Sequence, residues 1–338
     1  MLLDKIGNMD KIQLLQQKMQ TLAPYSLHSR VHALNSFNTS LANSYLKRED
    51  ELGFGVSGSK IRKYASLVPY LLENSVKAVL VIGGAYSNNV LGISQLLIEN
   101  SIKPILFLLG DATQPRQGNL LLTSILVADE QIHWVARKNW PLIESIIAEY
   151  QQTHSACATI IPEGACMPEA LLGALSLPLD ILKNEQQLQQ QFQHVFIDAG
   201  TGLTAIAVIL AFAWLNKKIQ IHVLLLADDE SAFLNKLAQF QIIFEQLINE
   251  NIDSNLMITL LKLYTPKQAK SFGAINANLF KFIKTIAREE GFFTDPIYSA
   301  KLLFEAKNII QKENLVGNVL IIHSGGALTL MGFQARLY

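Results

Sequence analysis

The segment HVFIDAGTGLTAIAV, residues 194–208, decides the fold class of this 338-residue chain. Its first residues form an apolar run of strand character, and the apolar residues after Thr204 predict a helix. Residues 200–204 form the turn between them, and their backbone N–H groups and hydroxyls lie where a helix start favours an anion such as phosphate. The turn has neither the lysine of a P-loop nor the glycine spacing of a dinucleotide fingerprint, so an ordinary strand-to-helix turn is the alternative.

The same alternation of strand and helix recurs along the chain. It predicts an α/β protein with mainly parallel, twisted sheets. The glutamine-rich segment 184–193 is expected to be a solvated connector between a first lobe, built from the strands before it, and a second lobe built from the strands after it. The expected strands are residues 78–84, 104–110, 131–136, 158–164, 194–200, 219–227, 257–264 and 318–326.

Composition excludes several classes of protein. Half of the residues are hydrophobic, and 28 Lys and Arg balance 28 Asp and Glu, so no net charge favours nucleic acid or an anionic membrane. The longest apolar run, 205–215, is too short to span a bilayer and predicts a buried helix. Residues 1–19 lack a signal-peptide core, and Cys157 and Cys166 form no disulfide framework. We therefore expect a cytoplasmic protein, and the histidines and cysteines show no metal-ligand spacing.

A second segment, GVSGSKIRKYASL (55–67), places three positive charges where a helix is expected to begin. A helix is expected from about Ile61, so Lys60, Arg62 and Lys63 crowd a first turn where cations are disfavoured. One interpretation is that such cations are tolerated at about 0.3–1 kcal/mol each. The other is that one lysine is kept near cations so that its neutral amine is available for Schiff-base chemistry.

Polar residues also follow other expected strands. In open α/β sheets ligands bind beyond the carboxyl ends of strands, so these loops are candidate sites. In the loop of residues 83–89, an ordinary helix N-cap would explain one of the three polar residues but not all three. In the loop of residues 323–326, His323 is expected to be structural rather than catalytic. The loops are GGAYSNN (83–89) with Ser87, Asn88 and Asn89, IPEG (161–164) with Glu163, and HSGG (323–326) with Ser324.

Taken in order, these loops resemble the pyridoxal-phosphate enzymes of the tryptophan-synthase-β fold type, in the branch of D-cysteine desulfhydrase and 1-aminocyclopropane-1-carboxylate deaminase. The resemblance runs from about residue 45 onward and implies a fold type II enzyme with two three-layer α/β/α domains and pyridoxal 5'-phosphate in the cleft between them. It implies a large domain of residues 1–62 and 175–338, a small domain of residues 63–174, and a homodimer. The matching pieces are KREDEL (47–52), SGSKIRKY (57–64), GGAYSNN (83–89), IPEG (161–164), GTGLT (200–204), DPIYSAK (295–301) and HSGG (323–326).

The resemblance also implies roles for single residues. Lys60 would hold the cofactor covalently and later move the substrate's Cα proton, Ser87 would grip or attack the substrate, and Tyr298 would lie over it. Ser324 would face the pyridine nitrogen, and because a serine adds no charge we expect that nitrogen to stay largely neutral. Asn88 would bond the 3'-oxygen, Gly200, Thr201, Gly202, Leu203 and Thr204 would hold the phosphate, and Asn89, Glu163 and Phe272 would join Ser87, Asn88 and Tyr298 around the substrate.

Five positions depart from the family pattern and bear on the reaction. Ser59 replaces an asparagine, and Ala165 and Cys166 replace a glycine and a serine or threonine. Phe272 replaces a tyrosine and Ser299 an acid, both of which the cyclopropane ring opening is thought to use. We therefore expect α,β-elimination on a small amino acid, with D-cysteine giving pyruvate, ammonia and sulfide. The alternatives are a 1-aminocyclopropane-1-carboxylate deaminase and a homologue that binds the cofactor or an amino acid without turnover.

Overall fold

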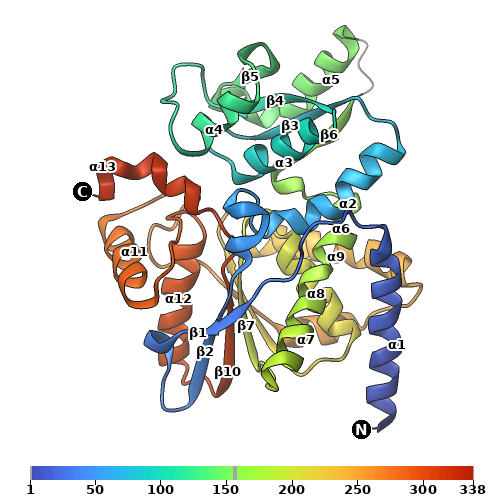
Figure 1. Cartoon of the computed structure of the whole chain (residues 1–338), viewed down its shortest axis with the longest axis vertical. Helices are drawn as coiled ribbons and strands as arrows, with labels where there is room; N and C mark the ends of the chain where they lie inside the picture. Colours follow the sequence, from blue (N-terminus) through green and yellow to red (C-terminus); the bar gives the residue numbers. More distant parts are fainter. Residues whose placement is uncertain (1, 155–157, 338) are drawn as a thin grey trace.

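The computed structural model describes residues 2–154 and 158–337, whose strands form two sheets (Figure 1). The larger sheet has the order β1-β2-β10-β7-β8-β9 and the smaller sheet the order β5-β4-β3-β6. Apart from the antiparallel β1–β2 pair, every strand pair in the described residues is parallel. The strands are β1 Val31–Ala33, β2 Ala42–Lys47, β3 Ala78–Gly84, β4 Lys103–Leu109, β5 Ile132–Val135, β6 Thr159–Ile161, β7 His194–Ala199, β8 Gln220–Leu225, β9 Leu261–Tyr264 and β10 Gly317–Ile322.

Helices cover both sheets, and α2 runs between the two lobes (Figure 1). The predicted α/β architecture with mainly parallel sheets is confirmed. The helices are α1 Leu2–Lys18, α2 Lys60–Glu73, α3 Asn88–Glu99, α4 Gly118–Leu126, α5 Ile143–Thr153, α6 Leu171–Ala174, α7 Ser176–Leu188, α8 Leu203–Trp214, α9 Glu230–Ile248, α10 Ser254–Leu260, α11 Ala277–Glu290, α12 Ser299–Lys312 and α13 Gln334–Leu337.

The large sheet buries a different apolar layer on each face. On β7, Val195 and Ile197 face the layer formed with α6 to α10, whereas Phe196 faces the layer formed with α11 and α12. This alternation is the two-residue period of a strand covered on both sides. The predicted buried helix is confirmed, since α8 is buried along nearly its whole length.

The small sheet has the same three-layer arrangement. Val79 and Val81 of β3 pack with α2, α3 and α4, whereas Leu80 and Ile82 pack on the side of α5. The predicted domain boundaries stay a prediction. The one after residue 62 falls inside the first turn of α2, and the one after residue 174 falls between α6 and α7.

The structure corrects two sequence predictions in the large lobe. Residues 257–264 are not one strand, because Asp253 caps a helix that continues to Leu260 and only Leu261–Tyr264 joins the sheet. Met257 and Leu260, three residues apart, bury the same face of that helix.

The glutamine-rich segment 184–193 is likewise not a solvated connector along its whole length. It begins inside α7, where Asn184 and Glu185 are buried. The Glu185 carboxylate accepts a hydrogen bond from Phe192 N and pairs with Lys217 at 2.7 Å. The segment is thus fastened to the large lobe by polar contacts that its composition does not indicate.

The strands β1 and β2 were not predicted. β2 reads ANSYLK, with polar residues at positions that become buried between β1 and β10. Its Lys47 is completely buried. No helix among the described residues is both long enough and apolar enough to cross a membrane, and Cys157 lies outside the described residues.

Candidate active site

The polar loops predicted from the sequence converge at the carboxyl ends of both sheets. Four glycines mark the contacts, because a side chain on any of them would strike the neighbouring loop. A Cβ on Gly58 would collide with Ser324 O and one on Gly164 with Thr201 Oγ1, whereas one on Gly200 would lie 3.1 Å from the Tyr298 ring. A Cβ on Gly326 would lie 3.2 Å from Asn88 Nδ2. Segments far apart in the chain, such as Gly58 and Ser324, are thus in close contact, as a site between two lobes requires.

Lys60 stands at the centre of this convergence. It is the first residue of α2, and Ser59 N donates to Ser324 O at 2.9 Å, which ties the helix start to the end of β10. Its Nζ lies 5.7 Å from the centre of the Tyr298 ring. Burial lowers the pKa of the Lys60 amine, and the carboxylates of Asp198 and Asp295 act in the opposite direction. The environment therefore favours the neutral amine more than water would.

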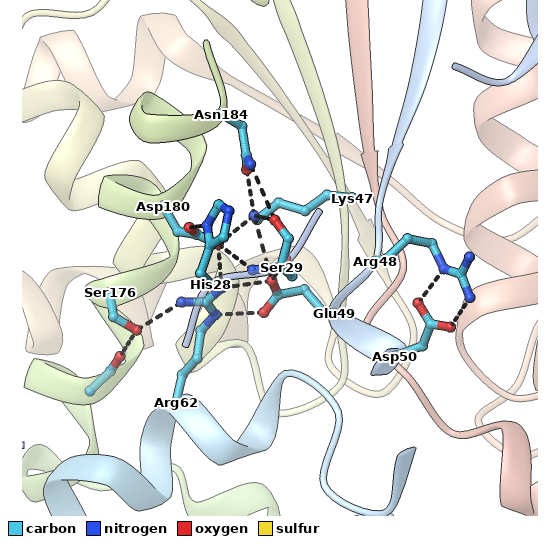
Figure 2. A network of polar contacts seen from close by, with 11 residues as sticks. His28, Ser29, Lys47, Arg48, Glu49, Asp50, Arg62, Ser176, Asp180 and Asn184 are labelled. Carbon is cyan, nitrogen blue, oxygen red and sulfur yellow. Dashed lines mark hydrogen bonds and ion pairs between the residues drawn. The ribbon is translucent and has the colours of Figure 1, made fainter. Parts of the chain in front are cut away.

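Arg62 does not act on Lys60 and instead belongs to a buried ionic network (Figure 2). Its guanidinium donates to Glu49 at 2.5 and 2.7 Å and to Asp180 at 2.9 Å. Lys47 Nζ donates to the same Asp180 carboxylate at 2.6 Å and to Asn184 at 2.6 Å. Two buried cations thus face two buried carboxylates. The network joins α2 to β2 and α7.

Lys63 also has its own partner. Its Nζ donates to Gly164 O at 2.9 Å, and burial lowers its pKa to about 8. The three first-turn cations therefore have different surroundings, and the depressed pKa of Lys60 has burial as its cause rather than its cationic neighbours. The sequence alone could not separate these explanations.

Within residues 2–154 and 158–337, the side-chain donors of Ser87 and Asn88 have no acceptor. Ser87 is the N-cap of α3, and its Oγ accepts from Asn89 N at 3.1 Å and Val90 N at 3.3 Å, which leaves its hydroxyl hydrogen available. Asn88 Oδ1 accepts from Asn119 Nδ2 at 2.7 Å and from Thr329 Oγ1 at 3.2 Å. Those contacts fix the amide so that Nδ2 is the group left to donate to an oxygen anion.

The structure places two other residues predicted to bind the substrate, Asn89 and Glu163, in different surroundings. Asn89 is only 1% exposed, and its Oδ1 accepts from Tyr64 OH at 3.0 Å, so it joins α3 to α2. The side chain of Glu163 is exposed at the end of β6. Asn89 is thus engaged within the protein, whereas the Glu163 carboxyl is near enough to Tyr298 to raise the pKa of that phenol, and both roles stay predictions.

Tyr298 and Phe272 lie side by side at the entrance to α12. Their ring centres are 5.9 Å apart in an edge-to-face arrangement, and Phe272 is 55% exposed. Burial and the nearby carboxylates Asp295 and Asp198 raise the pKa of the Tyr298 phenol, which keeps it a neutral hydrogen-bond donor. Ser299, where the deaminase branch has an acid, is fully buried and donates to Asp295 at 2.7 Å.

The 200–204 turn has the geometry expected of an anion site. Gly202 adopts φ +93° as the N-cap of α8, and the first amides of that helix have no partner within it. Thr201 and Thr204 remain partly exposed, whereas Leu203 is completely buried and can contribute only its backbone.

His323 has the structural role expected of it. Its Nε2 donates to Phe293 O at 2.7 Å, and its Nδ1 accepts from Gly325 N at 3.2 Å. Both ring nitrogens are thus engaged within the protein, and Gly325 and Gly326 then turn the chain with φ of +113° and +91°.

Several residues of the site were missed by sequence reasoning. They are the supports of predicted residues rather than members of a motif. Asn119 and Thr329 orient Asn88, and Asp295 accepts four hydrogen bonds that shape the turn before α12. Only the DPIYSAK motif contained a signal, because an Asp before a helix start is a common cap.

A comparison with protein families decides the identity of the site. Residues 29–325 match the family described as "Pyridoxal-phosphate dependent enzyme". This chain belongs to that family.

The enzyme also resembles individual members. It is 24% identical over 309 residues to the "Bifunctional D-cysteine desulfhydrase/1-aminocyclopropane-1-carboxylate deaminase, mitochondrial" of Arabidopsis thaliana, covering 85% of this chain and 73% of the relative. It is 25% identical to the "1-aminocyclopropane-1-carboxylate deaminase" of Mesorhizobium japonicum, covering 86% and 88%. These relatives carry the names of the branch that the motifs indicated.

Solved structures confirm the fold type of the enzyme. A protein described as an "ACC deaminase homologue" superposes with a TM-score of 0.80 at 22% identity, covering 94% of both chains. The diaminopropionate ammonia lyase of Escherichia coli superposes with a TM-score of 0.66 at 12% identity, covering 97% of this chain and 91% of the other.

The residues present fit pyridoxal phosphate, the cofactor of the family. A buried amine suits its aldehyde, the amide-lined turn before α8 suits its phosphate, and the free Asn88 Nδ2 suits its 3'-oxygen. No group of three or more His, Cys, Asp or Glu residues within 2–154 and 158–337 could hold a metal ion.

Proposed function

We propose that this pyridoxal-phosphate-dependent lyase catalyses α,β-elimination on a small amino acid, with D-cysteine as the favoured substrate. The reaction breaks the Cα–H and Cβ–S bonds and releases sulfide, and hydrolysis of the resulting enamine gives pyruvate and ammonia. The observation that carries the proposal is that Phe272, beside Tyr298, has no hydroxyl, and that Ser299, which donates to Asp295, provides no acid.

The site residues would divide the work as follows. The bound cofactor supplies the electron sink for ionisation of the Cα–H bond. Lys60 is the covalent anchor and the base, because burial favours its neutral amine. The free hydrogen of Ser87 donates to the substrate carboxylate, and Tyr298 closes the site as a neutral donor.

Phosphate binding would use the first turn of α8. Its free amides and the helix dipole favour an anion there. Lys63 and Lys236 lie close to the same turn, since Lys63 binds Gly164 O and Lys236 lies 3.5 Å from Thr201 O. Asn88 Nδ2 would donate to the 3'-oxygen of the cofactor, and Ser324 would lie at its pyridine nitrogen.

A spectral screen with product assays tests the proposal. The cofactor-loaded protein is mixed with D-cysteine, L-cysteine or 1-aminocyclopropane-1-carboxylate, and sulfide, pyruvate and 2-ketobutyrate are measured. We expect D-cysteine to change the visible cofactor band with release of sulfide and pyruvate in equal amounts, and no ketobutyrate. Ketobutyrate from the cyclopropane would favour the deaminase, and a band that no amino acid perturbs would favour a binding protein without turnover.

A cytoplasmic location and a homodimeric state also remain proposals. The first is supported by the lack of a disulfide framework, with Cys166 free, and the second by the family resemblance alone. The Arabidopsis relative carries the word mitochondrial in its name. Light scattering of the purified protein would measure the mass of the assembly.

A further inference from the structure

Asp198 is a charged residue of the site that none of the family motifs accounts for. It is the penultimate residue of β7 and pairs in register with Leu224 of β8. By strand alternation it shares a face with Phe196, and both Phe196 and Leu224 belong to the apolar layer under α12. The carboxyl therefore ends an apolar row at the edge of the sheet where the loops converge.

One oxygen of this carboxyl is unsatisfied. Asp198 Oδ1 is buried and has no hydrogen-bond partner in the part of the chain that the structure describes. A buried polar atom without a partner is costly, and such atoms at a functional site often have a ligand as their partner. No lysine, arginine or histidine of the described residues forms an ion pair with Asp198 within 4.0 Å, whereas Glu49 and Asp180 are each paired with cations.

The neighbours of the carboxyl identify the kind of ligand. Ser324, which follows β10, lies against it with its hydroxyl. From α2 the amines of Lys60 and Lys63 face it, and from the turn before α12 Asp295 and Tyr298 do. Burial and Asp295 raise the pKa of the Asp198 carboxyl, and Ser324 and Lys60 oppose that rise with a smaller effect. A cationic or hydrogen-bond-donating partner for the carboxyl would offset the cost of its burial.

We propose that Asp198 is the acidic partner of the cofactor's ring nitrogen, with Ser324 holding the carboxyl in place and one proton shared between the carboxyl oxygen and the nitrogen. The inference rests on the cofactor placement proposed above, in which Ser324 lies near that nitrogen. It reverses the expectation from Ser324 alone, since a carboxylate stabilises the protonated ring and a serine does not. A protonated ring withdraws electrons from Cα more strongly.

Binding of two cofactors to one variant tests this directly. The probes are pyridoxal phosphate and its analogue in which carbon replaces the ring nitrogen. Asp198→Asn should weaken binding of pyridoxal phosphate about tenfold or more and change binding of the carbon analogue less than twofold. Equal losses of affinity for both probes would overturn the proposal, because the carboxyl would then support the fold of the site rather than the ring nitrogen. No loss for either probe would also overturn it, because the carboxyl would then not contribute to cofactor binding.

The state of the nitrogen itself gives a second readout. With ¹⁵N-labelled pyridoxal phosphate, the ring resonance should have the shift of a protonated nitrogen in the wild type and in Asp228→Asn, which removes one carboxylate of an ion pair with Lys236 at 2.6 Å. Asp198→Asn should move it to the neutral value. A wild-type resonance already at the neutral value would refute the assignment.

Borohydride reduction and peptide mass analysis separate this inference from the proposed function. If wild-type protein carries no cofactor on Lys60, the placement of the cofactor is wrong. If Lys60 carries it in both the wild type and Asp198→Asn while the nitrogen signal does not differ between them, only the role of Asp198 is wrong.

Discussion

Lys60 and Lys63 lie one helical turn apart on α2, yet their surroundings assign them different tasks. Lys60 Nζ lies beside the Tyr298 ring, whereas Lys63 Nζ donates to Gly164 O. We expect Lys60→Ala to abolish the cofactor adduct that borohydride fixes to the protein, since no other amine occupies that position. Peptide mass analysis after reduction measures it.

Lys63→Ala is the matched control for this prediction. It should keep the adduct on Lys60 while weakening cofactor binding, because it removes a cation that binds Gly164 O, beside Thr201 of the turn of residues 200–204. Loss of the adduct in Lys63→Ala and its survival in Lys60→Ala would show that the register of the motif is wrong.

At the residue scale, the sequence predicted which loops converge better than which of their side chains point toward that convergence. Asn88 and Asn89 are adjacent polar residues at the start of α3, and about 100° of helix rotation separates their side chains. Asn88 meets Asn119 and Thr329, whereas Asn89 is buried against Tyr64. Composition of a loop cannot supply this rotation, because it depends on how α3 packs.

At the scale of elements, the start of α2 is fixed by the buried ionic network. Replacing Arg62 by Met would leave Glu49 and Asp180 with one cation fewer in a water-free environment. We expect a loss of about 3–5 kcal/mol in the free energy of unfolding, measured by urea denaturation of the cofactor-free protein. The double variant Arg62→Met with Asp180→Leu should lose less than the sum of the two single variants.

An exposed ion pair gives the matched control for the network. Arg30 and Glu51 pair at 2.6 Å, and their side chains are 56% and 39% exposed. Arg30→Met should therefore change the free energy of unfolding by less than about 1 kcal/mol. A comparable loss in Arg30→Met and Arg62→Met would contradict the assigned importance of burial.

The elements that the sequence predicted are those whose burial pattern is local. Residues 78–84 and 194–199 are mainly apolar runs, the first ending in glycine and the second followed by one, and both form strands. β2 was missed because its polar side chains are buried by partners far away, such as Asp180 and Asn184 around Lys47. The sequence does not identify α10, because a short apolar run is compatible with both a strand and a helix.

At the scale of the whole molecule, His222 makes the stability depend on pH. It is fully buried on β8, stacked 4.1 Å from Phe196, and burial is the main cause that lowers its pKa to about 3. The unfolded chain binds a proton near pH 6.5 and the folded chain does not, so stability falls as the pH drops from 6.5 toward 3.

Between pH 7 and pH 5 this single site should lower the free energy of unfolding by about 2 kcal/mol. Urea denaturation at both pH values measures the difference, which should shrink by about that amount in His222→Gln. An unchanged difference in the variant would mean that His222 is protonated in the folded state.

Because β10 is the last strand to be synthesised, its place in the large sheet sets the order in which the two sheets can form during translation. β2 is made early but pairs only with β1 and β10, and β10 is also the neighbour of β7. The strands of the small sheet are all synthesised before β7, so this sheet can assemble before β10, the parallel partner of β2, has been made. Ser324, whose carbonyl holds the start of α2, arrives with that last strand. The lysine reaches its working position only when the sheet closes, so capture of the cofactor reports that synthesis has passed β10.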